Sequence, residues 1–337
     1  MGSTPMYSLL ALFFFLCTDT TGLSTQRRLS EYGADSSKVS LSGLSSGAYM
    51  AVQFHVAYSK SIMGAGIVAG GPFYCAEANV VKALGACMTS PEKIDVGFLT
   101  QVTKNTVITG TIDATSNMED DMVFLISGTR DSTVKQGVMK KLKEYYENFV
   151  DVPNIKCEFS LPAEHAFVTE TYGNSCGHNG SPFINDCDYD SAFHMLNHIY
   201  RGVSKPSSHV VLTGDFIEFD QSEFLPMSAP GQFGMASSGY IYVPYACKHS
   251  PSACKLHVVF HGCKQGINRL GDEYALNTGY NEIADENGII ILYPQATASA
   301  GNTNGCWDWW GYTGLQYACK LGPQMNAVNQ MINRILS

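Results

Sequence analysis

A serine flanked by glycines stands between a β-branched run and a helical run near the start of the chain. Residues Gly43-Leu44-Ser45-Ser46-Gly47 fit the pattern G-x-S-x-G, with KVSLSGL before them and AYMAVQFHVAYSK after them. In a strand–turn–helix of this kind the chain turns so sharply that a Cβ at either flanking glycine would collide with the neighbouring strand and helix. The pattern predicts that Ser45 is a nucleophile whose hydroxyl stands above the edge of a sheet.

A serine hydroxyl needs a histidine to take its proton and a carboxylate to orient that histidine. Asp131 follows the apolar run MVFLIS and would lie at the carboxyl end of a strand, where catalytic groups gather in open α/β sheets. The acidic residues at 119–121 precede that strand and would lie at its opposite end. His165 comes just after the next strand candidate, so the order serine, acid, histidine predicts a triad of Ser45, Asp131 and His165.

The sequence around four other histidines indicates structural roles for them. His194 and His198 are four residues apart, but HMLNH lacks the glutamate of the zinc motif H-E-x-x-H, so we expect a helix face and no metal site. His257 lies within the apolar run LHVVF, which is typical of a residue in a sheet. His55 lies on the helix after the serine turn, on a face that does not present it to Ser45.

Acyl transfer also needs two backbone N–H donors for the developing oxyanion. The N–H of Ser46, directly after the nucleophile, is the first candidate. The second usually comes from a His-Gly loop on an earlier strand, yet His261-Gly262-Cys263 ends the run LHVVF more than two hundred residues after Ser45. This order predicts a circular permutation cut just before the nucleophile strand, with the N–H of Cys263 as the second donor.

Short β-branched runs alternate with longer amphipathic stretches, which is typical of a parallel sheet covered by helices, an α/β fold. The predicted strands are 38–44, 63–69, 122–127, 155–161, 240–244, 256–260 and 288–293. The predicted helices are 48–60, 134–149, 189–200, 275–287 and 324–335. We expect residues 172–188, rich in Gly and Asn with two Cys, to be a disulfide-pinned loop.

The composition and the first residues indicate the class of protein. The 337 residues are 45% hydrophobic and carry a formal charge of −9 without any basic run, which argues against nucleic-acid binding. The apolar run of eleven at 7–17 is too short to span a bilayer and is followed by TDTTG, so residues 1–22 are expected to be a signal peptide, the alternative being a buried N-terminal helix. Residues 23–337 are then one secreted catalytic domain without a membrane span, and Asn179-Gly180-Ser181 is a glycosylation sequon weakened by Pro182.

Eleven cysteines are too many for a reducing compartment. With Cys17 in the signal peptide, ten remain and permit five disulfides. Close spacing predicts Cys75 with Cys87 and Cys247 with Cys254, and we also predict Cys263 with Cys306. That last bond would tie the oxyanion loop to the tryptophan segment that follows Cys306.

The segment CWDWWGY contains all three tryptophans of the chain. Aromatic rings offer a large apolar area at little entropic cost and suit a hydrophobic substrate, so Trp307, Trp309, Trp310 and Tyr312 are candidates for lining the cleft. Packing into the core is the alternative for each of them.

Taken together, these segments resemble the extracellular polyhydroxybutyrate (PHB) depolymerases and related secreted esterases, most closely the single-domain, circularly permuted fungal type. The matching segments are LSGLSSGAYMAVQ, IVAGGPFYCA, FLISGTRDSTV, NDCDYDSAFHMLNHIY, LHVVFHGCKQ, TGYNEIADENGIIILYPQ and NGCWDWWGY. The resemblance implies an α/β-hydrolase fold with Ser45, Asp131 and His165 as catalytic residues, and with Ser46 and Cys263 as oxyanion donors.

The chain departs from the family at two points. The family often has Pro-Thr shortly after the catalytic histidine, whereas this chain has Val168-Thr169, which affects the rigidity of the loop and not its chemistry. Bacterial relatives often add a linker and a polymer-binding domain; without them, we expect the catalytic domain's own surface to hold the polymer.

The resulting hypothesis is a secreted serine esterase that hydrolyses short-side-chain polyesters or their oligomers. An esterase for acetylated or feruloylated plant polysaccharide is the alternative within enzymology, and a non-catalytic recognition protein is the alternative outside it. We expect no cofactor, no metal, no nucleic-acid partner and a monomeric protein.

Overall fold

Parallel strands run through the centre of the molecule. The computed structural model describes residues 1–2, 27–207, 211–250 and 253–337. Its main sheet has the strand order β4 (Ile155–Glu158), β3 (Met122–Ile126), β2 (Gly64–Val68), β1 (Val39–Leu44), β10 (Lys255–Phe260), β11 (Ile289–Tyr293), β9 (Ser238–Val243) and β8 (Asp215–Asp220). The strands from β4 to β11 are parallel, while β9 and β8 pair antiparallel, so the sheet is mixed at one edge and not parallel throughout.

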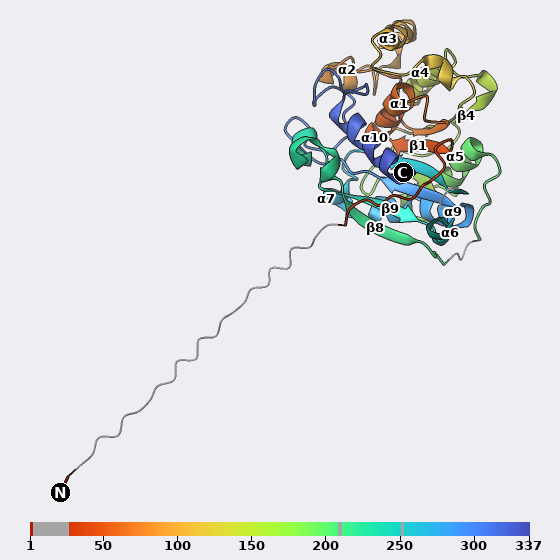
Figure 1. Cartoon of the computed structure of the whole chain (residues 1–337). Coiled ribbons are helices and arrows are strands. Elements are labelled where there is room, and N and C mark those ends of the chain that lie inside the picture. Colours follow the sequence, from red (N-terminus) through yellow and green to blue (C-terminus); the bar gives the residue numbers. More distant parts are fainter. Residues whose placement is uncertain (3–26, 208–210, 251–252) are drawn as a thin grey trace.

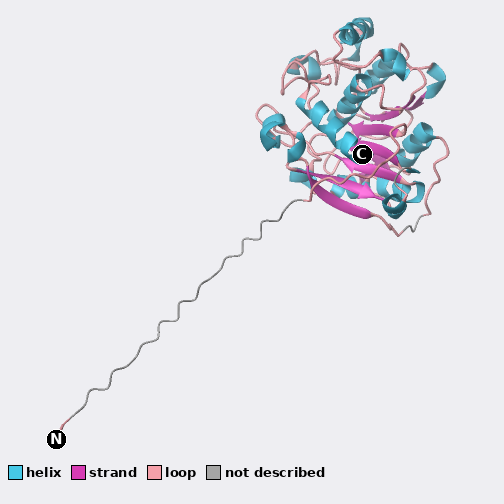
Figure 2. Cartoon of the chain, viewed as in Figure 1, coloured by secondary structure: helices cyan, strands magenta, loops and turns pink. Residues whose placement is uncertain are grey.

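Helices surround this sheet (Figure 2). They are α1 (Ser46–Ala57), α2 (Val80–Leu84), α3 (Val96–Ile108), α4 (Gln136–Tyr146), α5 (Ser191–Tyr200), α6 (Tyr245–His249), α7 (Ile267–Leu270), α8 (Glu273–Asn277), α9 (Tyr280–Asn287) and α10 (Pro323–Leu336). A small second sheet joins β5 (Phe167–Thr169), β7 (Ile184–Asp186) and β6 (Asn174–Ser175). Figure 1 shows α1 beside β1, which it follows directly in the chain.

The central strands are buried on both faces, as their continuous apolar runs require. Every residue of β1 and β11 is buried, and every residue of α1 is buried as well. The helix α1 contacts β1, β2 and β10, so it lies over the middle of the sheet. The strand and helix that flank Ser45 are therefore among the most enclosed elements of the chain.

All the predicted strands are present, with ends that shift by up to three residues. Four of the predicted helices are present, and the fifth, 275–287, is two helices, α8 and α9. Gly279, with φ +82°, breaks it in a conformation that other residues rarely adopt. The helix α3 and the edge strand β8 were not predicted.

Four disulfides link the loops in the described part of the chain. The predicted pairs Cys75–Cys87, Cys247–Cys254 and Cys263–Cys306 are confirmed, and Cys176–Cys187 pins the loop 172–188 as expected. The ten cysteines permitted a fifth disulfide, but it is not formed, because Cys157 on β4 and Cys319 both carry free thiols. Most of the predicted signal peptide, residues 3–22, lies outside the described residues. Within the described ranges, no helix is long and apolar enough to cross a membrane.

Candidate active site

Ser45 occupies a strained turn between β1 and α1. Its backbone has φ +57° and ψ −122°, an arrangement that L-residues adopt only when the surrounding structure enforces it. A Cβ on Gly43 would lie 2.2 Å from the carbonyl oxygen of Gly47, and a Cβ on Gly47 would lie 2.2 Å from the carbonyl oxygen of Phe260. Both predicted collisions, with the helix and with the neighbouring strand, are therefore present.

Asp131 and His165 form a buried hydrogen-bonded pair. The Nδ1 of His165 lies 2.8 Å from Oδ2 of Asp131, and the two side chains are almost fully enclosed. The other carboxylate oxygen of Asp131 accepts hydrogen bonds from the N–H groups of Thr133 and Val134, at 2.9 Å and 2.8 Å. These two bonds fix the carboxylate, and the bond to Nδ1 leaves Nε2 of His165 free to act as a base.

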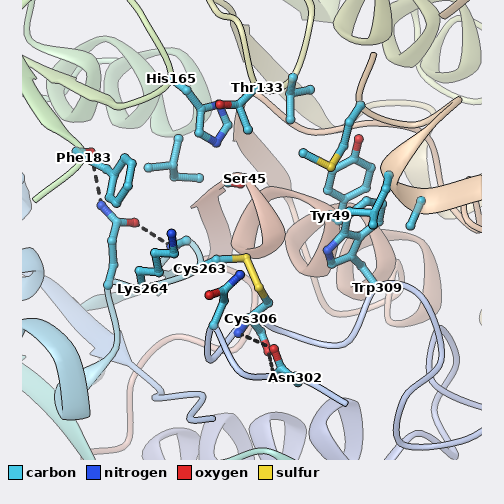
Figure 3. Close-up of a pocket in the computed structure, with 18 of the residues that line it drawn as sticks. Ser45, Tyr49, Thr133, His165, Phe183, Cys263, Lys264, Asn302, Cys306 and Trp309 are labelled. Carbon is cyan, nitrogen blue, oxygen red and sulfur yellow. Dashed lines mark hydrogen bonds between the residues drawn. A yellow bond between two sulfur atoms is a disulfide. The ribbon is translucent and has the colours of Figure 1, made fainter. Parts of the chain in front are cut away.

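One cavity of about 660 Å³ brings Ser45 and His165 together. In Figure 3 the imidazole of His165 points toward Ser45, and Cys263 lies on the other side of Ser45. Ser45, Asp131, His165 and Cys263 all follow the carboxyl ends of parallel strands, namely β1, β3, β4 and β10. The sheet therefore places every predicted catalytic group at one edge, although the first and the last of them are more than two hundred residues apart in sequence.

The two candidate oxyanion donors follow the carboxyl ends of two neighbouring parallel strands, β1 and β10. The N–H of Ser46 begins α1 and has no partner within that helix. On the other loop, the neighbours of Cys263 are fixed: the N–H of Gly262 donates to Oε1 of Gln265 at 2.7 Å, and the N–H of Lys264 donates to the carbonyl of Asn304 at 2.7 Å. Cys263 lines the cavity and is tied to Cys306 by the predicted disulfide.

The disulfide-pinned loop 172–188 contacts two other loops: the oxyanion loop, residues 261–266 after β10, and the acid loop, residues 128–134 after β3. The sequence did not predict these contacts. The Nε2 of Gln265 donates to the carbonyls of Pro182 and Phe183, at 2.9 Å and 3.1 Å. The side-chain amide of Asn179 donates to the hydroxyls of Ser132 and Thr133, both at 3.1 Å. Asn179 and Phe183 also line the cavity, so the loop 172–188 forms one of its walls.

The four aromatic candidates separate into two groups. Trp309 and Trp310 line the cavity, and Trp309 stacks on Tyr49 with ring centroids 4.0 Å apart. Trp307 is 0% exposed and packs edge-on against Phe260, so its predicted role in lining the cleft is wrong and the core alternative holds. Tyr312 lies outside the cavity lining, and its hydroxyl donates to the carbonyl of Cys306.

The opposite wall of the cavity is apolar. It is formed by side chains from the short helix α2 and the segment after it: Val80, Ala83, Leu84 and Met88. These residues were not predicted as part of the site. Among the described residues that line the cavity there is no carboxylate, and Lys264 is the single lysine or arginine.

A serine–histidine contact that does not involve Ser45 lies inside the sheet. His257 on β10 places Nδ1 2.6 Å from the hydroxyl of Ser40 and Nε2 2.8 Å from the hydroxyl of Ser42. All three residues are 0% exposed, and burial lowers the pKa of His257 to about 3. No substrate can reach this pair, which acts as a neutral polar bridge between β1 and β10, as expected for a sheet residue.

Three further histidines take the structural roles that were predicted for them, namely His55, His194 and His198. His55 is buried and places Nε2 2.9 Å from Oδ2 of Asp121, at the amino end of β3. His198 places Nε2 2.8 Å from the carbonyl oxygen of Asn154, and His194 stacks on Tyr189. Among the described residues, no group of three or more His, Cys, Asp or Glu is arranged to hold a metal ion.

Comparisons with known proteins agree with this arrangement. Residues 239–333 match the model of the esterase PHB depolymerase family. The chain is 48% identical over 305 residues to a poly(3-hydroxybutyrate) depolymerase of Delftia acidovorans, covering 90% of this chain but only 60% of the length of that relative. It is 35% identical over 328 residues to a polyhydroxybutyrate depolymerase of Talaromyces funiculosus, covering 92% of each chain.

Solved structures show the same likeness. A PHB depolymerase from Penicillium funiculosum matches with a TM-score of 0.82 and 33% identity over 92% of this chain and 98% of that chain. A PHB depolymerase complexed with an R3HB trimer matches with the same values. Because both the sequence and the strand arrangement agree over nine-tenths of the chain, this protein belongs to the PHB depolymerase family.

Proposed function

We propose that this protein is a serine esterase that hydrolyses poly(3-hydroxybutyrate), or related short-side-chain polyesters and their oligomers, through an acyl-enzyme. The observation that carries the proposal is one cavity lined by Ser45, His165 and Cys263, in which His165 is hydrogen-bonded to the buried Asp131. The relatives named as depolymerases and the neighbour complexed with an R3HB trimer support the choice of substrate.

The geometry supports acyl transfer in two steps, acylation of Ser45 and hydrolysis of the acyl-enzyme. Ser45 Oγ attacks the ester carbonyl carbon while Nε2 of His165 takes its proton, and the N–H groups of Ser46 and Cys263 hold the oxyanion. The C–O bond to the leaving alcohol then breaks, and the imidazolium returns the proton to the alcohol oxygen. Water attacks the acyl-enzyme with the same base, which releases the hydroxyacid and restores Ser45.

The lining of the cavity favours a polyester over a carbohydrate ester. The side chains of Leu84, Met88 and Trp310 form extended apolar surface, which suits the methyl and methylene groups of a hydroxyalkanoate chain. Acetylated or feruloylated polysaccharide remains the alternative substrate, to be separated by experiment.

Rates on PHB film and on acetylxylan, measured side by side, test the substrate. We expect soluble hydroxyacid products from the film and at least tenfold slower release of acetate from acetylxylan. Ser45→Ala must abolish film hydrolysis, and Ser337→Ala, at the exposed chain end, serves as the control. Faster hydrolysis of acetylxylan would favour the carbohydrate alternative. A folded protein that hydrolyses no ester would favour the recognition alternative.

We further propose that the order of the chain is a circular permutation of the α/β-hydrolase order. The loop after β10 carries the candidate oxyanion residue, and β10 pairs in parallel with β1 although it follows β1 by about two hundred residues in the chain. The two ends of the part of the chain from residue 27 onward also lie together, because the N–H of Tyr32 donates to the carbonyl of Ile335 at 3.2 Å. Joining the two ends and cutting before β10 would restore the usual order.

We propose that the protein is secreted and acts as a monomer. The four disulfides support an oxidising compartment, and residues 1–22 would supply the signal. Sequencing the amino terminus of the protein from the culture medium tests the first statement, with a start near residue 23 expected. Light scattering in solution tests the second, with a mass of one chain expected.

A further inference from the structure

A second carboxylate lies between the two loops that carry the candidate acid and histidine. Glu164 directly precedes His165, and its Oε2 accepts a hydrogen bond from the N–H of His165 at 3.0 Å. The same oxygen accepts from the N–H and from the hydroxyl of Ser132, at 3.0 Å and 3.1 Å. Ser132 directly follows Asp131, so one oxygen atom joins the residue after the acid to the histidine itself.

We propose that Glu164 is a positioning residue that holds the acid loop and the histidine loop in register and places a second negative charge beside the imidazole. This inference rests on the proposed function for its catalytic meaning. It goes beyond the triad, because Glu164 is not one of the residues that line the cavity and acts only through its contacts with His165 and Ser132.

The surroundings of Glu164 fit this role. Its backbone N–H donates to the carbonyl of Cys176 at 3.0 Å, and Asn179 from the same disulfide-pinned loop donates to the hydroxyl of Ser132 at 3.1 Å. Partial burial alone would raise the pKa of Glu164, but the hydrogen bonds from Ser132 and His165 outweigh burial and hold the pKa below its usual value. The group is therefore a carboxylate at the pH where an esterase of this kind works.

A carboxylate at this position acts on the reaction in two ways. It fixes the backbone of His165 relative to Asp131, and small misplacements of a catalytic base slow the chemical step strongly. Its charge also stabilises the imidazolium that forms when Ser45 loses its proton. An amide in its place would keep the shape and lose the charge.

Other titratable or charged groups around His165 stay constant in such a comparison. They include Asp131, which is hydrogen-bonded to its ring, and Tyr49 and Lys264, which line the same cavity. Burial raises the pKa of Tyr49 far above neutrality, so this side chain stays uncharged throughout the measurement.

Titration of the His165 imidazole by NMR, together with the pH dependence of the rate on a soluble butyrate ester, tests the proposal. The full-length mature chain is compared with Glu164→Gln, Glu164→Asp and Ser132→Ala, and His165→Asn identifies the signal. In Glu164→Gln we expect the titration midpoint and the acid limb of the rate profile to move to lower pH, because a negative charge that stabilises the imidazolium is lost. We also expect kcat to fall about tenfold with KM nearly unchanged.

The two other variants separate charge from position. Ser132→Ala and Glu164→Asp both retain the carboxylate, so we expect the midpoint to stay in place while kcat falls. An unchanged midpoint and unchanged kcat in Glu164→Gln would overturn the proposal. If Glu164→Gln does not fold, an unchanged kcat in Glu164→Asp would overturn it instead. If the wild-type chain hydrolyses no ester, the proposed function fails, whereas the NMR titration still reports on Glu164.

Discussion

Gly47, at the start of helix α1, lies directly against the carbonyl oxygen of Phe260, at the end of strand β10. A Cβ at Gly47 would lie 2.2 Å from that oxygen and 2.4 Å from the carbonyl oxygen of His261. The candidate nucleophile turn and the candidate oxyanion loop therefore share one contact surface. The distance between Ser45 and Cys263 is set by how closely these two backbones approach.

Gly47→Ala is expected to destabilise the protein by about 3 kcal/mol or more, because the added methyl group meets backbone atoms that cannot rotate away. Chemical unfolding followed by circular dichroism measures the change. Gly97→Ala is the matched control: Gly97 is exposed in α3, where the alanine should stabilise by roughly 0.5 kcal/mol. Equal stabilities for the two variants would contradict the close packing of α1 against β10.

Gln265→Ala is expected to lower kcat by about 10- to 100-fold with little change in KM, because the oxyanion loop loses its link to Gly262 and to the disulfide-pinned loop. Steady-state kinetics on a soluble ester measures both constants. Gln330→Ala, on the exposed face of α10, should leave them unchanged. A rise in KM at constant kcat would show that Gln265 serves substrate binding and not the oxyanion loop.

The fold was predictable where local pattern determines structure. The strands of the main sheet that are buried on both faces are continuous apolar runs, which need no tertiary information to identify. The strand β8 was missed because it is an edge strand with the sequence DFIEFD. Its three acidic residues interrupt the alternation of apolar and polar residues that would indicate a strand. The helix α3 was missed because only Val96, Leu99, Thr100 and Thr103 are fully buried, in a stretch whose other residues are polar, exposed or only partly buried.

The sequence was enough to predict the candidate catalytic residues, but not most of the residues that line the cavity around them. Ser45, Asp131 and His165 follow strand ends, so strand order and residue type suffice to find them. The contacts of Gln265 and Asn179 are made to backbone carbonyls and hydroxyls of distant loops, which no residue pattern encodes. In the irregular segment after Cys306, alternation could not separate the buried Trp307 from Trp310, which lines the cavity.

Two buried histidines make the folded state sensitive to acid. Burial lowers the pKa of His257 to about 3 and that of His261 to about 4, whereas both titrate near 6.5 in the unfolded chain. As pH falls below about 6.5, these two histidines bind protons in the unfolded chain but not in the folded chain. The free energy of unfolding therefore declines until the pH reaches the pKa of each histidine in the folded state. Each such histidine costs up to about 1.4 kcal/mol per pH unit.

Urea unfolding at several pH values between 7 and 4.5 measures this decline. His257→Gln removes one titrating group and should flatten the curve, while His249→Gln, at an exposed position of α6, should not. An identical pH dependence in His257→Gln and in the wild type would show that His257 is not held neutral by the fold.

Trp310→Ala is expected to raise KM for a hydroxybutyrate oligomer about two- to tenfold while leaving stability nearly unchanged, because this half-buried ring lines the cavity. Trp307→Ala should instead cost about 3–5 kcal/mol of stability, because it empties a fully buried site. Thermal unfolding and oligomer kinetics on both variants separate the two roles. A raised KM without loss of stability in Trp307→Ala, together with a loss of stability in Trp310→Ala, would show that Trp307 and not Trp310 lines the substrate cleft.

Labelling with a fluorophosphonate, followed by peptide mass mapping, tests the central claim most directly. The probe reacts only with a serine activated by a base and an oxyanion site, and we expect one adduct per chain, located on Ser45. The adduct should be absent in Ser45→Ala and present in Ser40→Ala, because Ser40 and its partner His257 are sealed inside the sheet. An adduct on any other serine, or a folded protein that takes up no label, would contradict the assignment of Ser45 as the nucleophile.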